Sequence, residues 1–448
     1  MEKTDPGRKM KVLLHSHFPA GHCYPMQAAA QALVFRGHHV VWLTSADNEA
    51  RVRLTGADFV PTTAIAAVDA PLMRRHETGL LDGDWSRHRG RLLAQVNEYR
   101  SVLDDFEADV LLVDVLPHGA RALFELGEIP VYATLGVIPM YSSAWNAPHA
   151  VSGRQPPTTW FGMLVNWLRH VYVRWIVLPW SLRPVLNDQR SVLGLGSLPY
   201  GQPLEAFTYS RFLHIQASSP TLEFGMKPAY IEKVSYVGPL VAQLKSPSTQ
   251  NLPDWWGRAV AHPRVIGITQ GTLAMDPTSL IVPSVEALSP DPGNLLVVVS
   301  PHSAELEERF GQGRHGNILY ADWLPYHLLL PLLRLLITNG GYGSITQALS
   351  HKVPLLCAGQ TEDKKDTAAR VSWAGAGIDL KTDNPSAEQV RTAADRILDD
   401  SGNYLENATR LGVELNALGG GETVCAALED LVQRTRLTKK PLKDIGWW

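Results

Sequence analysis

Short apolar runs alternate with longer amphipathic segments along this chain, and this alternation constrains its fold more than any other feature. The runs have the length and composition of strands that are buried on both faces of a sheet. They occur in two blocks, at residues 11–15, 39–44, 110–115 and 129–134, and then at residues 264–269, 294–300, 335–338, 353–358 and 378–381. Strands that alternate with helices form parallel sheets covered by helices. The sequence therefore predicts an α/β fold with two parallel sheets.

A stretch rich in serine, proline and polar residues separates the two blocks. It reads VAQLKSPSTQNLP from residue 241 onward and is typical of a linker. The predicted units are two Rossmann-like domains at residues 1–240 and 256–425, a linker at 241–255 and a tail at 426–448. Two facing domains of this kind place a ligand cleft between them, at the carboxyl ends of the strands.

Composition and charge exclude several classes of protein. Lys and Arg number 41 against 44 Asp and Glu, a net charge of −3, so the chain lacks the basic surface of a nucleic-acid-binding protein. Its three cysteines form no CxxC pair, which argues against a disulfide framework or a zinc site. The first ten residues lack the apolar core of a signal peptide, and no uncharged apolar run reaches the roughly 18 residues of a spanning helix. We expect a cytoplasmic protein with no stable membrane insertion.

A glycine-rich loop follows the run at residues 335–338. It reads Asn339-Gly340-Gly341-Tyr342-Gly343-Ser344, and a helix is predicted to open near Ile345. Glycine lets the backbone approach a ligand closely, and a helix N-terminus offers unpaired N–H groups and the positive end of a dipole. A phosphate or diphosphate is the natural ligand for such a loop. The alternative is a tight turn with no ligand.

Two other loops of the second block have similar chemistry. Residues 268–272 end a strand at a glycine flanked by hydroxyl groups, and residues 322–326 place Trp323 where its ring can stack on a base. Each loop has a purely structural interpretation when it is taken alone. Because all three loops lie in one block, we predict that they converge on a nucleotide-diphosphate site.

The motifs of the second block, in this order, resemble the donor-binding signature of the family-1 glycosyltransferases. They are W-x-P at Trp323, T-x-G-G-x-G-S from Thr338, V-P-L from Val353 and T-E-D from Thr361. The first half adds Gly21-His22 with Pro25, Arg36-Gly37-His38 and the segment 237–240. The resemblance therefore spans nearly the whole chain, and it is weakest at residues 66–97 and 145–204.

This resemblance implies the GT-B fold, in which two facing Rossmann-like domains enclose an interdomain cleft. It implies an N-terminal domain that binds the acceptor and a C-terminal domain that binds a UDP- or dTDP-sugar. It also implies that the tail forms a helix that returns to the N-terminal domain. The transfer would be a reaction of secondary metabolism, in which a sugar is moved to a small molecule.

The resemblance also implies roles for the residues of the donor site. Trp323 would stack on the base, residues of the glycine loop would contact the diphosphate, and Asp363 would bind the sugar hydroxyls. The chain departs from the family at Asn339, where a histidine is usual, at Gln347, where a glutamate is usual, and at Lys364, where a glutamine is usual. The predicted donor-binding residues are Gly21, Thr272, Trp323, Asn339, Gly341, Tyr342, Gly343, Ser344, Gln347, Glu362, Asp363 and Lys364.

Transfer of a sugar to a hydroxyl group needs a base near the attacking oxygen. His22 follows the first predicted strand at the cleft edge, and the resemblance implies that it is this base. The expected partner is Asp114, which ends another predicted strand and would hold the imidazole in the required tautomer. Asp109 begins that strand and is a weaker candidate. We assign no chemistry to His15 and His17, which flank the same loop.

Five of the 13 tryptophans lie between residues 145 and 183. We predict a helical insertion there, and three interpretations of its aromatic residues are open. They can pack on the core, line an apolar acceptor pocket, or form a membrane-surface helix together with Arg169 and Arg174. The predicted acceptor-binding residues are Trp145, Trp160 and Trp167.

A metal site is not expected. The run Asp82-Gly83-Asp84 resembles the DxD metal motif of the other glycosyltransferase fold, but no predicted strand anchors it, so we interpret it as a surface loop. No other cluster of Asp and His has metal-ligand spacing. We therefore predict no cofactor, with a UDP-sugar as co-substrate.

The sequence thus leads to one principal hypothesis and two alternatives. The principal hypothesis is an inverting transferase that moves a sugar, with glucose favoured, from a UDP-sugar to a hydroxyl of a small hydrophobic or aromatic acceptor. The first alternative is a sterol or lipid glucosyltransferase that works at a membrane surface. The second is a non-catalytic auxiliary protein that binds nucleotide sugars.

Overall fold

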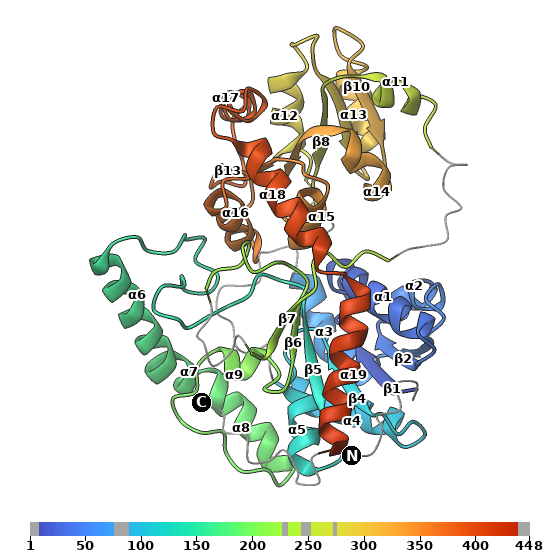
Figure 1. The fold of residues 1–448 in the computed structure, drawn as a ribbon, viewed down its shortest axis with the longest axis vertical. Helices are drawn as coiled ribbons and strands as arrows, with labels where there is room; N and C mark the ends of the chain where they lie inside the picture. The colour runs from blue at the N-terminus through green and yellow to red at the C-terminus, as the bar shows by residue number, and fades with distance from the viewer. Residues whose placement is uncertain (1–8, 76–88, 226–231, 243–251, 272–275, 438–448) are drawn as a thin grey trace.

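The computed structural model describes residues 9–75, 89–225, 232–242, 252–271 and 276–437. Its strands form two separate parallel sheets, one in each half of the chain (Figure 1). The first sheet has the order β3-β2-β1-β4-β5-β6-β7, and the second has the order β10-β9-β8-β11-β12-β13. The predicted α/β fold with two parallel sheets is confirmed.

The strands of the first sheet are β1 (Lys11–His15), β2 (His39–Thr44), β3 (Asp58–Pro61), β4 (Val110–Val113), β5 (Tyr132–Gly136), β6 (His214–Gln216) and β7 (Val234–Tyr236). Those of the second sheet are β8 (Val265–Thr269), β9 (Leu295–Val299), β10 (Ile318–Ala321), β11 (Leu333–Thr338), β12 (Leu355–Cys357) and β13 (Gly377–Asp379). Each of the nine apolar runs in the sequence overlaps a strand. The strands β3, β6, β7 and β10 were not predicted, because they are only three or four residues long and three of them carry polar or proline residues.

The helices of the first half are α1 (Ala20–Phe35), α2 (Glu49–Arg53), α3 (Ala64–Arg75), α4 (Arg91–Leu103), α5 (His118–Leu126), α6 (Trp160–Tyr172), α7 (Leu178–Trp180), α8 (Leu182–Val192) and α9 (Glu205–Thr208). Those of the second half are α11 (Trp256–Ala261), α12 (Ile281–Leu288), α13 (Ser303–Phe310), α14 (Tyr326–Leu329), α15 (Tyr342–Ser350), α16 (Lys364–Trp373), α17 (Ala387–Leu398), α18 (Tyr404–Ala417) and α19 (Gly421–Leu437). None of the helices that the structure describes is both long and apolar enough to cross a bilayer.

The strand order of each sheet reverses once, and these two points position the site. In the first sheet the reversal lies between β1 and β4, and in the second it lies between β8 and β11. The loops that follow two such strands diverge to opposite faces of the sheet, which leaves a crevice at the carboxyl ends where ligands bind. The sequence places the predicted base and its aspartate after β1 and β4, and the glycine loops after β8 and β11.

The last described helix, α19, crosses back from the second half and packs on the first (Figure 1). Its apolar face, with Val424, Cys425 and Leu428, belongs to the same buried core as β1 and β4. Its acidic face pairs with the end of α1, where Arg36 lies 2.9 Å from Glu422 and 2.8 Å from Glu429. The return of the chain end is therefore present, and its helix begins at Gly421, upstream of the predicted start at residue 426.

Candidate functional site

A cavity of about 2020 Å³ lies between the two halves of the chain. From the first half, the residues that follow β1 and β4 line it, among them His17, Gly21, His22 and Asp114. From the second half, the loops after β8, β10, β11 and β12 line it, with Gly271, Trp323, Gly341, Tyr342, Gly343, Ser344, Gln347, Glu362, Asp363 and Lys364. Most of the predicted catalytic and donor-site residues therefore face one cleft.

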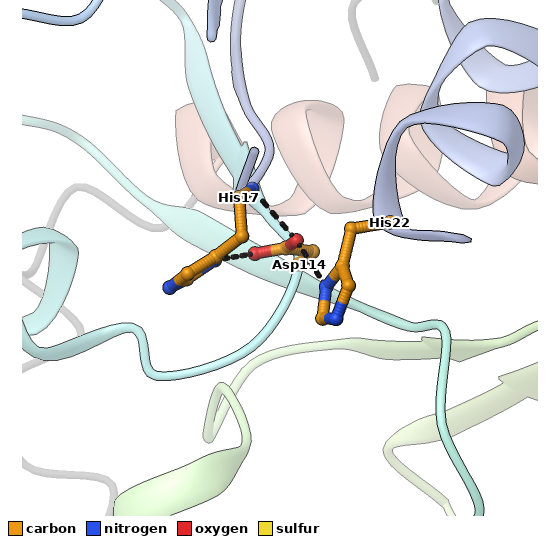
Figure 2. A group of neighbouring side chains, drawn as sticks. All are labelled: His17, His22 and Asp114. Atoms are coloured by element: carbon orange, nitrogen blue, oxygen red, sulfur yellow. Dashed lines mark hydrogen bonds and ion pairs between the residues drawn. The ribbon is translucent and has the colours of Figure 1, made fainter. Parts of the chain in front are cut away.

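One carboxylate is shared by two histidines at the first-half wall of the cleft. Nδ1 of His22 lies 2.8 Å from Oδ2 of Asp114, and Nδ1 of His17 lies 2.6 Å from Oδ1 (Figure 2). Figure 2 shows the two rings approaching the carboxylate from opposite sides. The Asp114 side chain is fully buried and also accepts hydrogen bonds from the backbone N–H groups of His17 and Val115. Asp114 is thus held rigidly by four donors.

His22 is the member of this carboxylate group that faces the cleft. The residue lies in the first turn of α1, which begins at Ala20, rather than in the loop that the sequence suggested. Its side chain remains 21% exposed to the cleft. Because Nδ1 faces Asp114, a neutral His22 carries its proton there and keeps Nε2 as an acceptor. This is the tautomer that a base for an acceptor hydroxyl needs.

His17 is held in one tautomer by an arginine. Nε2 of His17 lies 2.6 Å from a terminal nitrogen of Arg91, and Arg91 also pairs with Asp69. A guanidinium can only donate hydrogen bonds, so Nε2 of His17 accepts and its proton resides on Nδ1, which donates to Asp114. Arg91 therefore fixes the orientation in which His17 donates to Asp114.

The electrostatics of the site follow from this arrangement. Burial disfavours the charged imidazole of His22, but the charge of Asp114 and the hydrogen bond to it outweigh burial and raise the pKa of His22 above 6.5. Burial alone would raise the pKa of Asp114. The contacts of Asp114 with His17 and His22 outweigh burial and hold this pKa well below the usual value. The charges of Asp363 and Glu362, which line the same cavity from the second half, also raise the pKa of His22.

Among the described residues, His17, His22 and Asp114 form the group that could hold a metal ion, because their ligand atoms lie within 4.8 Å of one another. The contacts of the group argue against this use. Both Nδ1 atoms already donate to the carboxylate, and the guanidinium of Arg91 lies directly behind His17. A cation would have to displace two protons beside an existing positive charge. The predicted independence from metals stays a prediction.

On the opposite wall, the start of α15 faces the cleft. Gly341 is its N-cap and no side chain caps the helix. The first-turn residues Tyr342, Gly343 and Ser344 line the cavity, so their backbone N–H groups and the helix dipole are available to an anion. Gly340 has a φ of +90°, a conformation that glycine adopts without strain, and this bend turns the chain from β11 into the helix.

Asn339 joins two of the loops after the second sheet. Its Oδ1 accepts a hydrogen bond from the backbone N–H of Gly271 at 3.1 Å, which ties the loop after β8 to the loop after β11. Its Nδ2 is buried and finds no partner among the residues that the structure describes. A buried amide donor without a partner costs roughly 1–3 kcal/mol. An oxygen acceptor from a ligand would remove this penalty, although Asn339 does not itself line the cavity surface.

The loop after β12 brings two carboxylates and a lysine to the cleft. Nζ of Lys364 lies 2.9 Å from Oε2 of Glu362 and 3.1 Å from Oγ1 of Thr361. The extra cation is therefore compensated within the loop. Burial, followed by the neighbouring charge of Glu362, raises the pKa of Asp363 to about 6. Asp363 can then act as a hydrogen-bond acceptor for sugar hydroxyls mainly above that pH.

The comparisons with known proteins agree with this architecture. Residues 308–431 match the model described as the C-terminal domain of erythromycin biosynthesis protein CIII-like proteins. The chain is 32% identical over 425 residues to 4'-demethylrebeccamycin synthase of Lentzea aerocolonigenes, covering 92% of this chain and 97% of that protein. The chain belongs to the family-1 glycosyltransferases. It is an enzyme of sugar transfer, and the GT-B fold implied by the sequence motifs is confirmed.

Two further matches support the assignment to the glycosyltransferases. UDP-glucosyltransferase A1 of Starmerella bombicola is 27% identical to this chain over 433 residues, covering 92% of this chain and 90% of that protein. The spinosyn rhamnosyltransferase SpnG, solved in complex with thymidine diphosphate, superposes with a TM-score of 0.65 at 21% identity, over 94% of this chain and all of that one. The solved structure bears on the fold alone.

In this glycosyltransferase, Trp323 and Gln347 reach the cleft as predicted from the motifs. Trp323 is 68% exposed in the loop after β10, with its ring available to a base. The amide of Gln347 donates to the backbone carbonyl of Gly343 at 3.1 Å, one turn earlier in α15. Thr272 and the Asp82–Asp84 run lie outside the described residues, so their roles stay predictions.

Tyr342 has a second role that the motif did not indicate. Its hydroxyl accepts a hydrogen bond from Gln216 of the first half at 2.6 Å and donates to Glu223. Glu223 also pairs with Arg370 of α16 at 2.8 Å, and both side chains are buried. The glycosyltransferase thus joins its two halves by a buried polar network directly beneath the donor loop.

The three tryptophans predicted to bind the acceptor do not line the cleft. Trp145 precedes α6, while Trp160 and Trp167 lie on α6, and all three are solvent-exposed. The interpretation that these tryptophans pack on the core is also wrong, because their side chains are exposed. The insertion is helical as predicted, but its aromatic face points outward. Other members of the segment reach the cavity, among them Arg169, Tyr172, Val173 and Val177.

Sequence reasoning missed His17 and Arg91. His17 stands two residues beyond the end of β1, and its alternation with His15 was the only signal. The ring of His15 turns to Tyr99, 2.6 Å away, and burial lowers its pKa to about 3. Arg91 begins α4 far along the chain and carries no motif, so only the fold could bring it to His17. Asp109, the weaker candidate for the partner of His22, lies away from the cleft. Its carboxylate accepts hydrogen bonds from the backbone N–H of Lys11 and from the side chain of Arg436.

Proposed function

We propose that this enzyme is an inverting O-glycosyltransferase that moves a hexose, with glucose favoured, from a UDP-sugar to a hydroxyl of a small hydrophobic acceptor. One observation carries the proposal. The 2.8 Å contact between His22 and the buried Asp114 stands across the same cleft from the uncapped N-terminus of α15. A base and an anion site that face each other are what sugar transfer from a nucleotide diphosphate requires.

The chemistry follows from these positions. Nε2 of His22 takes the proton of the acceptor hydroxyl, and Asp114 stabilises the imidazolium that forms. The acceptor oxygen bonds to the anomeric carbon while the bond from that carbon to the diphosphate oxygen breaks. The electron pair leaves with the diphosphate, and the charge that develops there is met by the first-turn N–H groups at Gly343 and Ser344. Attack from the face opposite the leaving group inverts the anomeric carbon.

The donor is assigned from the second half of the chain. Trp323 stacks on the base, Asp363 and Glu362 receive the sugar hydroxyls, and Asn339 ties the loop after β8 to the loop after β11. The pairing of Lys364 with Glu362 leaves no net cation at the sugar, so a neutral hexose fits better than a uronic acid. A relative is named as a UDP-glucosyltransferase, which supports UDP-glucose, while SpnG binds thymidine diphosphate.

The acceptor is assigned from the lining of the first half rather than from the tryptophans. The cavity wall there is mainly apolar, with Val115, Leu135, Val137, Ile138, Tyr141 and Phe207. Such a surface favours an aromatic or polycyclic molecule with a hydroxyl at His22. The alternative of a non-catalytic auxiliary protein finds no support in a site whose histidine and aspartate are both in place.

The test is transfer by the purified protein. UDP-glucose and a panel of phenolic and polycyclic alcohols are supplied, a gain of one hexose is followed by mass spectrometry, and the linkage is read by NMR. A β-glycoside from the α-linked donor is expected. An α-glycoside would contradict inversion. Binding of UDP without transfer to any acceptor, from UDP- or dTDP-hexoses, would contradict the enzyme proposal and favour the auxiliary protein.

A further inference from the structure

The helix α6 presents an apolar face to solvent. Trp160 is 77% exposed and Trp167 is 49% exposed, and the exposed side chains of this helix lie on one side of it. They are Trp160, Phe161, Leu164, Trp167, Leu168 and Tyr172. In Figure 1 the helix forms the outer left edge of the first half, away from the second half. We call this face, together with the exposed Trp175, Ile176 and Trp180 that follow it, the α6 surface.

The side of α6 that faces the protein is polar. Asn166 is the one residue of α6 that the fold fully buries, and its amide donates to the backbone carbonyls of Trp145 and Ala147. His170, one turn later, bonds the carbonyl of Ala147 at 2.9 Å. A helix on a water-soluble protein normally has the opposite arrangement, with its apolar stripe toward the core. α6 therefore turns its apolar side to solvent and its polar side to the protein. An exposed apolar face of this kind fits a surface that a partner covers when the protein functions.

The charge of the segment indicates what covers it. Residues 129–187 contain no Asp or Glu, but they contain Arg154, Arg169, Arg174 and Arg183. Arg169 is exposed at the border of the α6 surface, and the guanidinium of Arg174 lies 5.5 Å from the ring centre of Trp175. Tryptophan, tyrosine and arginine beside an apolar face are the composition that settles at the boundary between lipid headgroups and acyl chains. A segment whose charged side chains are all arginine complements an anionic lipid surface.

The α6 surface is continuous with the mouth of the cleft. Tyr172 belongs to both. Arg169, at the border of the surface, also lines the cavity, as do Val173 and Val177 of the next turns. A protein that rests on a bilayer through the α6 surface would hold the acceptor side of the cleft at the lipid boundary. An apolar acceptor dissolved in the membrane could then enter without crossing water.

We propose that the α6 surface docks this enzyme on anionic lipid bilayers, with the helix lying in the headgroup region and the chain remaining on one side. Docking is independent of the chemistry in the cleft. Only the delivery of an apolar acceptor through the cleft mouth rests on the proposed function.

The test is co-sedimentation of the purified full chain with sucrose-loaded vesicles. One set contains phosphatidylcholine alone, and the other contains phosphatidylcholine and phosphatidylglycerol at a 3:1 ratio. We expect partition onto the anionic vesicles, a decrease in 0.5 M NaCl, and a loss of roughly tenfold or more in the partition coefficient of the Trp160→Ser/Trp167→Ser variant. The control is Phe35→Ser, which removes an aromatic ring that is 85% exposed at the end of α1 and should leave partition unchanged.

Thermal unfolding of each variant shows that the fold persists, because the replaced side chains are exposed. No turnover is measured, so a negative result here says nothing against the transferase, and an inactive enzyme says nothing against docking. Equal sedimentation of wild type and double variant, or none with anionic vesicles, would overturn the proposal. So would a wild-type dimer in light scattering that the double variant converts to a monomer, because the α6 surface would then join two copies. Binding of the surface to another protein without binding to vesicles would overturn it as well.

Discussion

Nδ1 of His22 lies 2.8 Å from Oδ2 of Asp114, although the two residues are 92 positions apart in the chain. They meet because β1 and β4 are neighbours in the sheet, with Leu14 opposite Leu112 and His15 opposite Val113. Each residue follows the carboxyl end of its strand, and the strand order reverses between the two strands. The contact is therefore a product of sheet topology.

Replacement of His22 by alanine should remove the base and leave the donor site intact. The turnover number is expected to fall roughly 10²–10⁴-fold, the usual contribution of a general base. Calorimetric affinity for UDP should change little, because the proposed nucleotide site lies in the other half. His39→Ala, which alters an exposed histidine of β2, should keep wild-type turnover. Near-normal turnover of His22→Ala would rule out this histidine as the base.

The pH profile should identify His22 through its partner. Burial lowers the pKa of His22, and Asp114 reverses this and raises it. A base works only when it is deprotonated, so activity falls as the pH drops through this raised pKa. In Asp114→Asn the raising influence is reduced, and the acidic limb of kcat/KM should move to lower pH while the plateau falls at least tenfold. Asp363, whose pKa is about 6, would give a limb that this variant leaves in place.

His17 should act as a positioning residue for the aspartate. Loss of its hydrogen bond in His17→Ala removes an interaction with a charged group, worth about 1.5–3 kcal/mol, so we expect a turnover roughly 10- to 100-fold lower. The KM for the nucleotide sugar should stay within about twofold. His17→Asn, which can still donate to the carboxylate, should recover part of the rate. A variant that loses only thermal stability would show that His17 serves the fold alone.

The exposed ring of Trp323 should bind the nucleotide base without supporting the fold. Stacking of one base on an aromatic ring contributes about 1–3 kcal/mol, so Trp323→Ala should weaken the affinity for UDP roughly 5- to 150-fold. Thermal unfolding should be unchanged, since 68% of the residue is accessible. Trp373→Ala, at another exposed position of the second half, is the control. Unchanged UDP affinity would place the base elsewhere.

The ion pair between Glu223 and Arg370 should be a main contributor to the connection of the two halves. Both side chains are buried, so Glu223→Ala leaves a buried guanidinium without its partner and should lower the free energy of unfolding by about 3–5 kcal/mol. Glu49→Ala breaks an exposed pair with Arg53 and should cost less than about 1 kcal/mol. Urea denaturation compares the two. Similar small losses would show that the buried pair is dispensable.

The strands and the donor loops were predicted from local sequence patterns. Buried strands of a parallel sheet are apolar along their whole length, so β1 and β2 could be bounded to the residue from sequence. The glycine run before α15 was recognised because its chemistry is contiguous in the chain. Short strands with polar residues, such as β6, have no such pattern, and their pairing with neighbours alone defines them.

The aromatic insertion shows the limit of composition. Its helical spacing was readable, but a helix face can point to the core, to a cavity or to solvent with the same residues. Asn166 fixes the orientation of α6, because its hydrogen bonds to backbone carbonyls turn the polar side of the helix inward. Nothing in the spacing of Trp160 and Trp167 distinguishes these orientations.

The amino-acid sequence by itself determined the two-sheet α/β class, the glycine loop at a helix start, and the candidate pair of His22 and Asp114. The first two depend on periodicity and on motifs that are contiguous in the chain, and the pair was implied by the resemblance to the family-1 glycosyltransferases. The tertiary structure decided that His17 and Arg91 complete the carboxylate site, that Asn339 links two loops, and that α6 turns its apolar face outward. Those facts depend on contacts between segments distant in the chain, which only the packing of the whole fold brings together.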